Sequence, residues 1–328
     1  MNELQGRDLD VVVIGHATVA LTADASLVHA THLARGQRGD ALLSCVQAAR
    51  LGASTVLVAR VGDDVFGDWL FESWEREGGH LDFTRRSPLK NALVLASVAD
   101  GPQRAITYRE GSAAATLDPA DLEGIPWGWT RLVFGTGATQ ALGPGPEATL
   151  ARAFALGRAS GARTVFDPAL RAHQWPSEAA ARRAFDALLP DTDVLILGAP
   201  YATGKLLGHA DVDDAARAAL DRGVPQVVLR EGTRGAVVVD RGRILHLPAA
   251  PDPPAPSAQV PPLDPAWPQA SFNGALLASL ARGGPLTDAV AFALRAQSHT
   301  RTAPVVDVGR PGAREPGAFD RLPGAELW

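Results

Sequence analysis

The sequence is poor in cysteine, in lysine and in long apolar runs. Among its 328 residues only Cys45 is a cysteine, and only Lys90 and Lys205 are lysines. A single cysteine excludes an intrachain disulfide and a cysteine-only metal cluster. No apolar run approaches the roughly 18 residues of a membrane-spanning helix. The net charge of −5 offers no basic footprint for nucleic acid or for an anionic membrane. We therefore expect a globular protein with neither nucleic acid nor a membrane as a partner.

Two further absences narrow the location and the chemistry. Residues 1–8 are polar and lack the charged-then-apolar layout of a signal peptide, which predicts a cytoplasmic location. The eight histidines form no HExxH motif or other metal-ligand spacing, and no GxSxG nucleophile motif is present. We therefore expect no metal site and no serine hydrolase of that class.

Strands and helices alternate along most of the chain. Short β-branched runs predict strands at 10–15, 54–61, 131–135, 163–166, 193–197, 226–229 and 236–239. Helical patterns cover 40–51, 66–77, 147–160, 178–189, 212–222, 271–282 and 285–298. Such alternation predicts a mostly parallel central sheet with helices on both faces, in a single α/β domain that spans residues 1–328.

Three stretches depart from this alternation. Residues 17–34 and 92–109 alternate mildly without helical caps, and we expect them to be inserted strands of a small sheet that covers one edge of the site. The segment Pro248 to Pro268 contains nine prolines, which excludes a central strand because proline cannot donate to a strand ladder. An extended, partly polyproline loop is expected there.

Five segments, in one order along the chain, resemble motifs of the ribokinase (PfkB) family of carbohydrate kinases. They are Gly39–Leu42 with Ala48–Gly52 (GGDALNVAxxLARLG), Arg60–Gly67 (VGDDxFG), Tyr108–Ala114 (YRxxSAA), Asp167–Arg171 with Trp175-Pro176 (DPNLRxxLWP), and Ser271–Ala278 (the tail of DTTGAGDAFNGALLA). The branch with 2-keto-3-deoxygluconate kinases and fructokinases fits best. The resemblance implies a ribokinase-like three-layer sandwich with a small β-sheet lid, a homodimer through that lid, and phosphoryl transfer from ATP to a sugar hydroxyl.

The segment that resembles the catalytic loop has lost its chemical groups. When Phe272-Asn273-Gly274 is matched to the motif, the position of the family's base is Ala270, which cannot accept a proton. The two glycines that would let the backbone approach phosphate become Trp267 and Gln269. Asp264 matches the motif's first Asp and is the fallback candidate for a non-standard base.

The segments that resemble the nucleotide and metal sites are altered unevenly. Arg230, Gly232 and Gly235 resemble the family's KLGxxGA loop, and with Asn273 they are the candidate nucleotide-binding residues. A strand–turn–strand hairpin without a ligand would explain the two glycines as well. The family's NxxE motif falls on residues 199–202, where both polar residues are replaced by alanine. ATP and Mg²⁺ are therefore expected as cofactors only if kinase activity survives.

The segments that resemble the sugar pocket keep part of their polar residues. The family's early Asp falls on Ala20, and the Asn of its GGDALNVA motif falls on Leu43. The candidate substrate-binding residues are Gly39, Asp40, Tyr108, Arg109, Asp167 and Arg171. The two arginines could hold a carboxylate or a phosphate through paired hydrogen bonds, or could form structural ion pairs. Gly39 and Asp40 could equally form a helix N-terminus with Asp40 as its cap.

Our leading hypothesis from the sequence is a PfkB-family homologue that has lost ordinary sugar phosphorylation. It would be a pseudokinase or a repurposed family member that binds a small sugar-like, sugar-acid-like or phosphorylated metabolite. One alternative is an active carbohydrate kinase for a 2-keto-3-deoxy sugar acid or a ketose, with a base such as Asp264, or a different reaction in the same cleft. Another alternative is a structural subunit that pairs through the lid.

Overall fold

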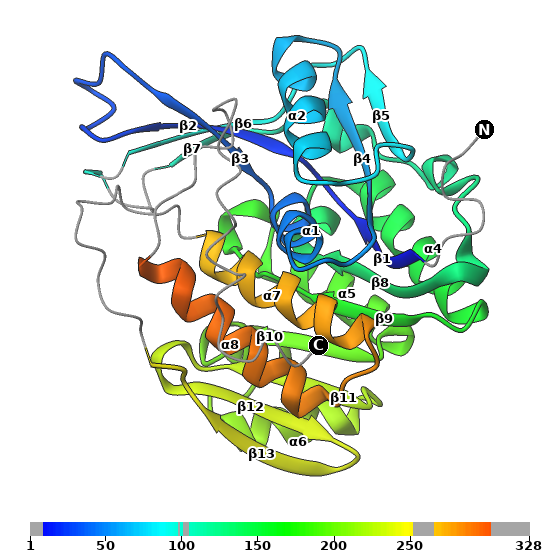
Figure 1. Cartoon of the computed structure of the whole chain (residues 1–328). Coiled ribbons are helices and arrows are strands. Elements are labelled where there is room, and N and C mark those ends of the chain that lie inside the picture. The colour runs from blue at the N-terminus through cyan, green and yellow to red at the C-terminus, as the bar shows by residue number, and fades with distance from the viewer. Residues whose placement is uncertain (1–8, 98, 101–104, 252–265, 303–328) are drawn as a thin grey trace.

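The computed structural model describes residues 9–97, 99–100, 105–251 and 266–302 (Figure 1). The strands are β1 Leu9–Ile14, β2 Thr18–Ala23, β3 Ala34–Arg38, β4 Thr55–Gly62, β5 Thr84–Ser87, β6 Leu93–Ser97, β7 Ile106–Tyr108, β8 Thr130–Thr136, β9 Arg163–Asp167, β10 Val194–Gly198, β11 Gln226–Arg230, β12 Gly235–Asp240 and β13 Arg243–Pro248. The helices are α1 Asp40–Arg50, α2 Val65–Arg76, α3 Gly137–Gln140, α4 Pro144–Ala159, α5 Glu178–Leu188, α6 Val212–Asp221, α7 Ala266–Ala281 and α8 Leu286–Thr302. None of the helices in these ranges is both long and apolar enough to cross a bilayer.

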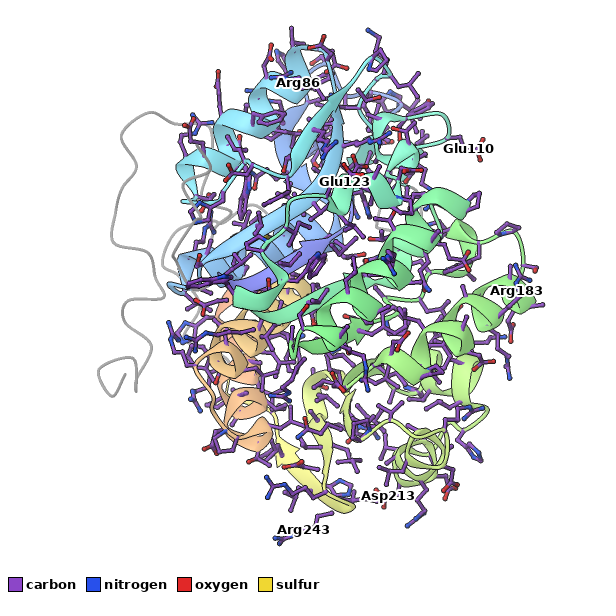
Figure 2. The ribbon with its side chains drawn as sticks, turned by 90° about the vertical axis from the view of Figure 1, so that its right-hand side faces the viewer. Arg86, Glu110, Glu123, Arg183, Asp213 and Arg243 are labelled. Atoms are coloured by element: carbon purple, nitrogen blue, oxygen red, sulfur yellow. The ribbon has the colours of Figure 1, made fainter. Side chains whose placement is uncertain are left out.

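Nine strands form the central sheet, in the order β13-β12-β11-β10-β9-β8-β1-β4-β5. The strands from β11 to β5 pair in parallel, whereas β12 and β13 add as an antiparallel hairpin at one edge. Figure 2 places Arg86 of β5 and Arg243 of β13 at opposite ends of the molecule, as the two edge strands require. Charged side chains on edge strands discourage pairing with a second sheet.

Helices cover both faces of this sheet, because its buried strands are apolar on both sides. Along β1, Val11 and Val13 join the core beneath α1, α7 and α8, whereas Val12 and Ile14 join the core beneath α4, α5 and α6. Alternate side chains of a strand point to opposite faces. The two helical layers are visible on either side of the sheet (Figures 1 and 2). The mostly parallel three-layer α/β architecture predicted from the sequence is therefore confirmed.

A separate four-stranded sheet, in the order β3-β2-β6-β7, is the small sheet that was expected as a lid. Figure 1 shows it beside one end of the central sheet, above the N-terminal end of α7. The small sheet expected at 17–34 and 92–109 is present, although its strand β3 extends to Arg38, and its role as a lid stays a prediction. Residues 98 and 101–104 of the second stretch lie outside the described residues. Strands β5 and β13 and the short helix α3 were not predicted.

The boundary of the proline-rich loop was predicted wrongly at both ends. Pro248 is the last residue of β13, and α7 begins at Ala266 rather than at residue 271. Pro268 fits inside the first turn of α7 because N–H groups there have no partner within the helix. Residues 252–265 lie outside the described residues.

Candidate functional site

The candidate site lies at the carboxyl ends of the central strands. Asp167 ends β9, Gly198 ends β10 and Arg230 ends β11. The first turn of α7 faces these ends, since Gln269 reaches Asp167. Ligands of open α/β sheets bind in the crevice outside the carboxyl ends of the strands.

Asp167 is the centre of a hydrogen-bond cluster in this crevice. Its Oδ2 atom accepts hydrogen bonds from Arg230 Nη2 at 3.0 Å, Gln269 Nε2 at 3.1 Å and Asn273 Nδ2 at 2.9 Å. Its Oδ1 atom accepts from the backbone N–H of Ala169 at 2.9 Å. The structure thus joins Asp167, expected on the sugar side, with Arg230 and Asn273, expected on the nucleotide side. Gln269 was missed as a member of this cluster.

Asp40 and Arg171 form a second fixed pair. Arg171 Nη1 and Nη2 donate to the two carboxylate oxygens of Asp40, at 2.5 and 2.9 Å. Burial alone would raise the pKa of Asp40, but the Arg171 guanidinium holds that pKa below its usual range. Of the alternative considered for Gly39 and Asp40, the helix N-terminus is present but the cap is not Asp40: Gly39 is the N-cap of α1, and no side chain caps this helix end.

The residue before Asp40, Gly39, has to be a glycine because it packs against the backbone of His16. It has a φ of 113°, and a Cβ atom there would lie 2.5 Å from the carbonyl oxygen of His16. This close approach places the loop after β1 directly against the start of α1. It therefore sets the position of Asp40, the next residue.

His16, His173 and Arg109 lie close enough to the Asp40–Arg171 pair to interact with it electrostatically. Burial lowers the pKa of His16 to about 4; Asp40 opposes that shift, and Arg109 and Arg171 add to it. Burial, Arg171 and Arg109 also lower the pKa of His173. The Nδ1 atom of His16 is enclosed and has no hydrogen-bond partner. Neither histidine was predicted here, although His16 follows β1 and His173 follows the Asp167–Arg171 motif.

Arg109 is half-buried and anchored by the backbone. Its Nη2 donates to the carbonyl oxygen of Gln174. Burial lowers the pKa of Arg109 and Glu110 opposes that shift. Its neighbour Tyr108 lies on the exposed lid strand β7 and is 60% exposed.

The pocket in the crevice is small. It has a volume of about 210 Å³. Its lining residues are Asp167, Ala169, Leu170, Arg171, Leu197, Gly198, Ala199, Tyr201, Ala202, Arg230 and Gln269. Two guanidinium groups and one carboxylate are its charged groups. Neither Tyr108 nor Arg109 lines this pocket.

The first turn of α7 buries the residues that replace the family's loop. Ala270 is 1% exposed and belongs to the core beneath α1, α7 and α8. Trp267 is 7% exposed, and the guanidinium of Arg50 lies 5.6 Å from the centre of its ring. Both side chains therefore pack inward, away from the pocket. Asp264, the fallback base, lies outside the described residues.

The turn that resembles the nucleotide loop keeps its glycine conformations. Gly232 has a φ of 64° and Gly235 a φ of 111°. A Cβ atom on Gly235 would lie 2.1 Å from the carbonyl oxygen of Leu247, so packing against the end of β13 requires a glycine here. Neither glycine takes part in the Asp167 cluster.

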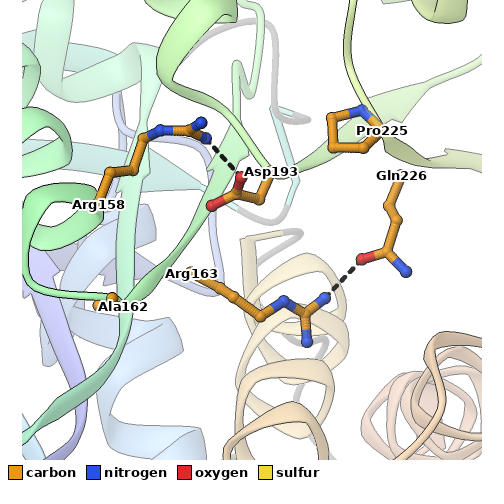
Figure 3. Close-up of a pocket in the computed structure, with 7 residues that line it drawn as sticks. Arg158, Ala162, Arg163, Asp193, Pro225 and Gln226 are labelled. Atoms are coloured by element: carbon orange, nitrogen blue, oxygen red, sulfur yellow. Dashed lines mark hydrogen bonds and ion pairs between the residues drawn. The ribbon is translucent and has the colours of Figure 1, made fainter.

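A larger pocket, of about 380 Å³, opens at the opposite, amino-terminal edge of the strands (Figure 3). Its guanidinium groups are engaged: Arg158 pairs with Asp193, and Arg163 donates to the Gln226 side chain at 2.5 Å. These contacts tie the starts of neighbouring strands together. We place the candidate site in the smaller pocket because it lies at the carboxyl ends of the strands, where ligands of open α/β sheets bind.

The comparisons with known proteins agree with this fold. The model of the pfkB family carbohydrate kinases matches residues 8–254. The chain belongs to this family. The match ends before α7.

Relatives with curated names support the same family. A 2-dehydro-3-deoxygluconokinase from Thermoproteus tenax is 32% identical over 241 residues, covering 71% of this chain and 73% of the relative. A 2-dehydro-3-deoxygluconokinase from Dickeya dadantii (strain 3937) is 26% identical, covering 73% and 79%. Among solved structures, the PfkB protein from Polaromonas sp. JS666 has a TM-score of 0.79 at 24% identity, covering 89% of this pfkB-family chain and 95% of the other. The last likeness supports the fold alone.

Proposed function

We propose that this pfkB-family chain binds a sugar acid in the crevice and does not phosphorylate it at the rate of an ordinary kinase. The observation that carries the proposal is Ala270, a buried methyl group at the position that resembles the family's base. A sugar hydroxyl must lose a proton as its oxygen attacks a phosphoryl group. Loss of a positioned base costs about 10²–10⁴-fold in rate.

The two carboxylates nearest the crevice are poor replacements for that base. Asp167 accepts four hydrogen bonds through its two oxygens. Asp40 is held by both ends of the Arg171 guanidinium, which stabilises its ionised form. Taking up a proton would sacrifice these contacts, so neither carboxylate is suited to general-base catalysis.

The described residues also do not fit a magnesium-bound nucleotide phosphate. Magnesium prefers carboxylate, phosphate and water oxygens. The positions that resemble the family's NxxE motif hold the hydrocarbon side chains of Ala199 and Ala202. Asp167 has both oxygens engaged already, and no cluster of three or more His, Cys, Asp or Glu side chains occurs within the described ranges.

The backbone of the α7 first turn is a poor phosphate cradle as well. Pro268 supplies no N–H group, and Trp267 and Gln269 carry side chains where the resembling motif has glycine. Preorganised N–H donors at such a turn stabilise the charge of a transferring phosphoryl group. Their loss adds to the loss of the base. The end of the family match at residue 254 agrees with a departure concentrated in this region.

The ligand class follows from the retained cations. Arg109 and Arg171 both act electrostatically on His16 and His173, so both guanidinium groups lie near these rings. Arg171 is paired with Asp40 there, and Arg109 faces a backbone carbonyl oxygen, with no carboxylate among its hydrogen bonds to the described residues. Guanidinium groups bind carboxylates through paired, charge-assisted hydrogen bonds. The names of the relatives from Thermoproteus tenax and Dickeya dadantii, both 2-dehydro-3-deoxygluconokinases, point to an acid sugar as well.

An active kinase with a non-standard base is the second candidate. It is favoured by the 32% identity to a protein named as a kinase. Asp264 would be the base in that case. Turnover by the unaltered chain that is lost in the Asp264→Ala variant would identify Asp264 as that base.

The test combines binding with turnover on one preparation. Calorimetry with gluconate and 2-keto-3-deoxygluconate should detect binding, and binding should weaken at least tenfold in Arg109→Gln. A coupled ADP-release assay with ATP, Mg²⁺ and a panel of sugars and sugar acids should detect no turnover above about 10⁻² of that of an active relative. Binding together with turnover at the relative's rate would overturn the proposal.

A further inference from the structure

His16 is a partly buried side chain just after β1, and its two ring nitrogens lie in different surroundings. The Nδ1 atom is enclosed and has no hydrogen-bond partner. The Nε2 atom is not enclosed, and it forms no hydrogen bond with any residue that the structure describes. The ring therefore has one nitrogen that a ligand can still reach.

The enclosed nitrogen indicates where the proton of the ring lies. Burial keeps His16 neutral at pH 7, since its pKa is about 4. A neutral imidazole has one N–H group, and its position is set by the surroundings of the other nitrogen. A proton on Nδ1 would bury an N–H group without an acceptor, which is rare in folded proteins. We therefore assign the proton to Nε2, which makes the accessible nitrogen a hydrogen-bond donor.

We propose that this Nε2–H group donates a hydrogen bond to the oxygen on C2 of the bound sugar acid, so that His16 is a specificity-determining residue of the crevice. The inference rests on the proposed function, because it takes the carboxylate of the ligand to be bound near Arg109. C2 is the carbon next to that carboxylate. Its oxygen can accept a hydrogen bond both as a carbonyl and as a hydroxyl.

The arrangement of the two arginines supports this assignment. The charges of Arg109 and Arg171 both act on the ring of His16, so both guanidinium groups lie near it. Arg171 is occupied by Asp40, whereas Arg109 has no carboxylate among its hydrogen bonds to the described residues. Arg109 is therefore the cation that can bind an acid there. A carboxylate at Arg109 brings the neighbouring C2 oxygen into the surroundings of His16.

The protein itself does not use the Nε2–H group. Asp40 acts electrostatically on the ring, but both of its oxygens accept hydrogen bonds from Arg171 and neither is bonded to His16. One edge of the ring packs against the start of α1, since a Cβ atom on Gly39 would lie 3.4 Å from Cδ2 of His16. This packing restricts the orientation of the donor, as selective binding requires.

The test compares gluconate with 2-deoxygluconate, in which a hydrogen atom replaces the hydroxyl on C2. Both have the same carboxylate, so the contribution of Arg109 is the same. Calorimetry on the full chain at pH 7 should show gluconate binding about tenfold more tightly, because the analogue leaves the donor without an acceptor. Equal affinities would overturn this inference and leave the proposed function standing. Binding of neither acid, nor of 2-keto-3-deoxygluconate, would overturn the proposed function and this inference with it.

Variants test whether His16 is the source of this preference. In His16→Leu the affinity for gluconate should fall about tenfold, while that for 2-deoxygluconate stays within about threefold. A purely structural role would weaken the binding of both acids and preserve their ratio. His29→Leu, in an exposed loop, is the matched control and should retain the preference. A preference that survives in His16→Leu, or that is lost in His173→Leu instead, would show that His16 is not the donor.

The assigned tautomer has its own measurement, which depends on no variant's affinity. In nitrogen NMR spectra of the full chain with labelled histidine, the ring signals of His16 are those missing from His16→Gln. We expect the pattern of the Nε2–H tautomer at pH 7. The pattern of the Nδ1–H tautomer would make Nε2 an acceptor and overturn the inference.

Discussion

Arg230 and Asp167 form an ion pair across the crevice, with Nη2 of the arginine 3.0 Å from Oδ2 of the aspartate and side-chain exposures of 11% and 1%. Gln269 and Asn273 donate to the same oxygen. The ends of β9 and β11 and the start of α7 are therefore tied together at one carboxylate. Gln269 stands where the motif that this segment resembles has a glycine of the phosphate-binding loop. In this chain its side chain instead belongs to the hydrogen-bond cluster around Asp167.

The Asp167 cluster should contribute measurably to stability. Replacing Asp167 by asparagine preserves its size but leaves the Arg230 guanidinium without its counter-charge in a buried place. We expect a loss of about 3 kcal/mol in the free energy of unfolding, measured by urea titration. The matched control is Asp214→Asn, which breaks the exposed Asp214–Arg217 pair and should cost less than about 1 kcal/mol. Equal losses in the free energy of unfolding for the two variants would show that the buried cluster stabilises the fold no more than an exposed ion pair does.

Placing a carboxylate at residue 270, the position matched to the family's base, should not restore kinase activity. In Ala270→Asp the new side chain would replace a methyl group that is 1% exposed in the core. Burying the charge should destabilise the fold, with a lowered melting temperature, and ATP-dependent turnover should stay at background. The control is Ala179→Asp in the exposed first turn of α5, which should have the same melting temperature as the unaltered chain. Turnover gained by Ala270→Asp alone would refute our interpretation of α7.

Acid should destabilise the protein partly through His16. Its pKa is about 4 in the folded chain and about 6.5 in the unfolded chain, so the unfolded state binds the proton more readily. The stabilising contribution is thus present above pH 6.5 and is lost as the pH falls toward 4, by up to about 3 kcal/mol. Asp40, whose pKa is also lowered, adds a loss at still lower pH.

The measurement is the free energy of unfolding of the unaltered chain and of His16→Gln at pH 7 and pH 5. The variant should show a distinctly smaller decrease between the two values. His29→Gln, in an exposed loop, is the control and should retain the full decrease. An identical pH dependence in all three proteins would exclude His16 as a source of acid sensitivity.

The close packing of Gly39 against His16 gives a fourth test. In Gly39→Ala a Cβ atom would stand 2.5 Å from a backbone oxygen, at a φ of 113° that alanine rarely adopts. We expect a loss of about 2 kcal/mol or more and weaker binding of sugar acids, because the strain displaces Asp40. Gly36→Ala on β3 is the matched control: its Cβ would meet no atom within 4 Å, so the change should be close to neutral.

The layered fold could be predicted from the sequence because its signals are local. Apolar runs marked the central strands, and helix ends also depend on nearby residues: Asp64 caps α2 by accepting hydrogen bonds from the N–H groups of Phe66 and Gly67. The start of α7 was misplaced because Pro268 is as typical of a loop as of the first turn of a helix. Strand β13 was missed because it is a largely exposed edge strand without a continuous apolar run.

The site was less predictable because its contacts are distant in sequence. The motif residues Asp167 and Arg171 were found, but no local pattern indicates that Gln269 donates to Asp167 across 102 positions. Asp40 was open to a capping role, and only the tertiary structure shows Arg171 on its carboxylate. The burial of His16 likewise arises only in the folded chain, where Gly39 at the start of α1 packs against it.

The central claim is that the crevice binds an acid sugar without ordinary phosphoryl transfer. Its most direct test is a single-turnover experiment in which the full chain, in excess over γ-labelled ATP, is mixed with Mg²⁺ and 2-keto-3-deoxygluconate at a concentration where calorimetry shows binding. We expect the label to remain in ATP over times in which an active relative completes its turnover. Transfer of the label to the sugar acid at the relative's rate would contradict the claim.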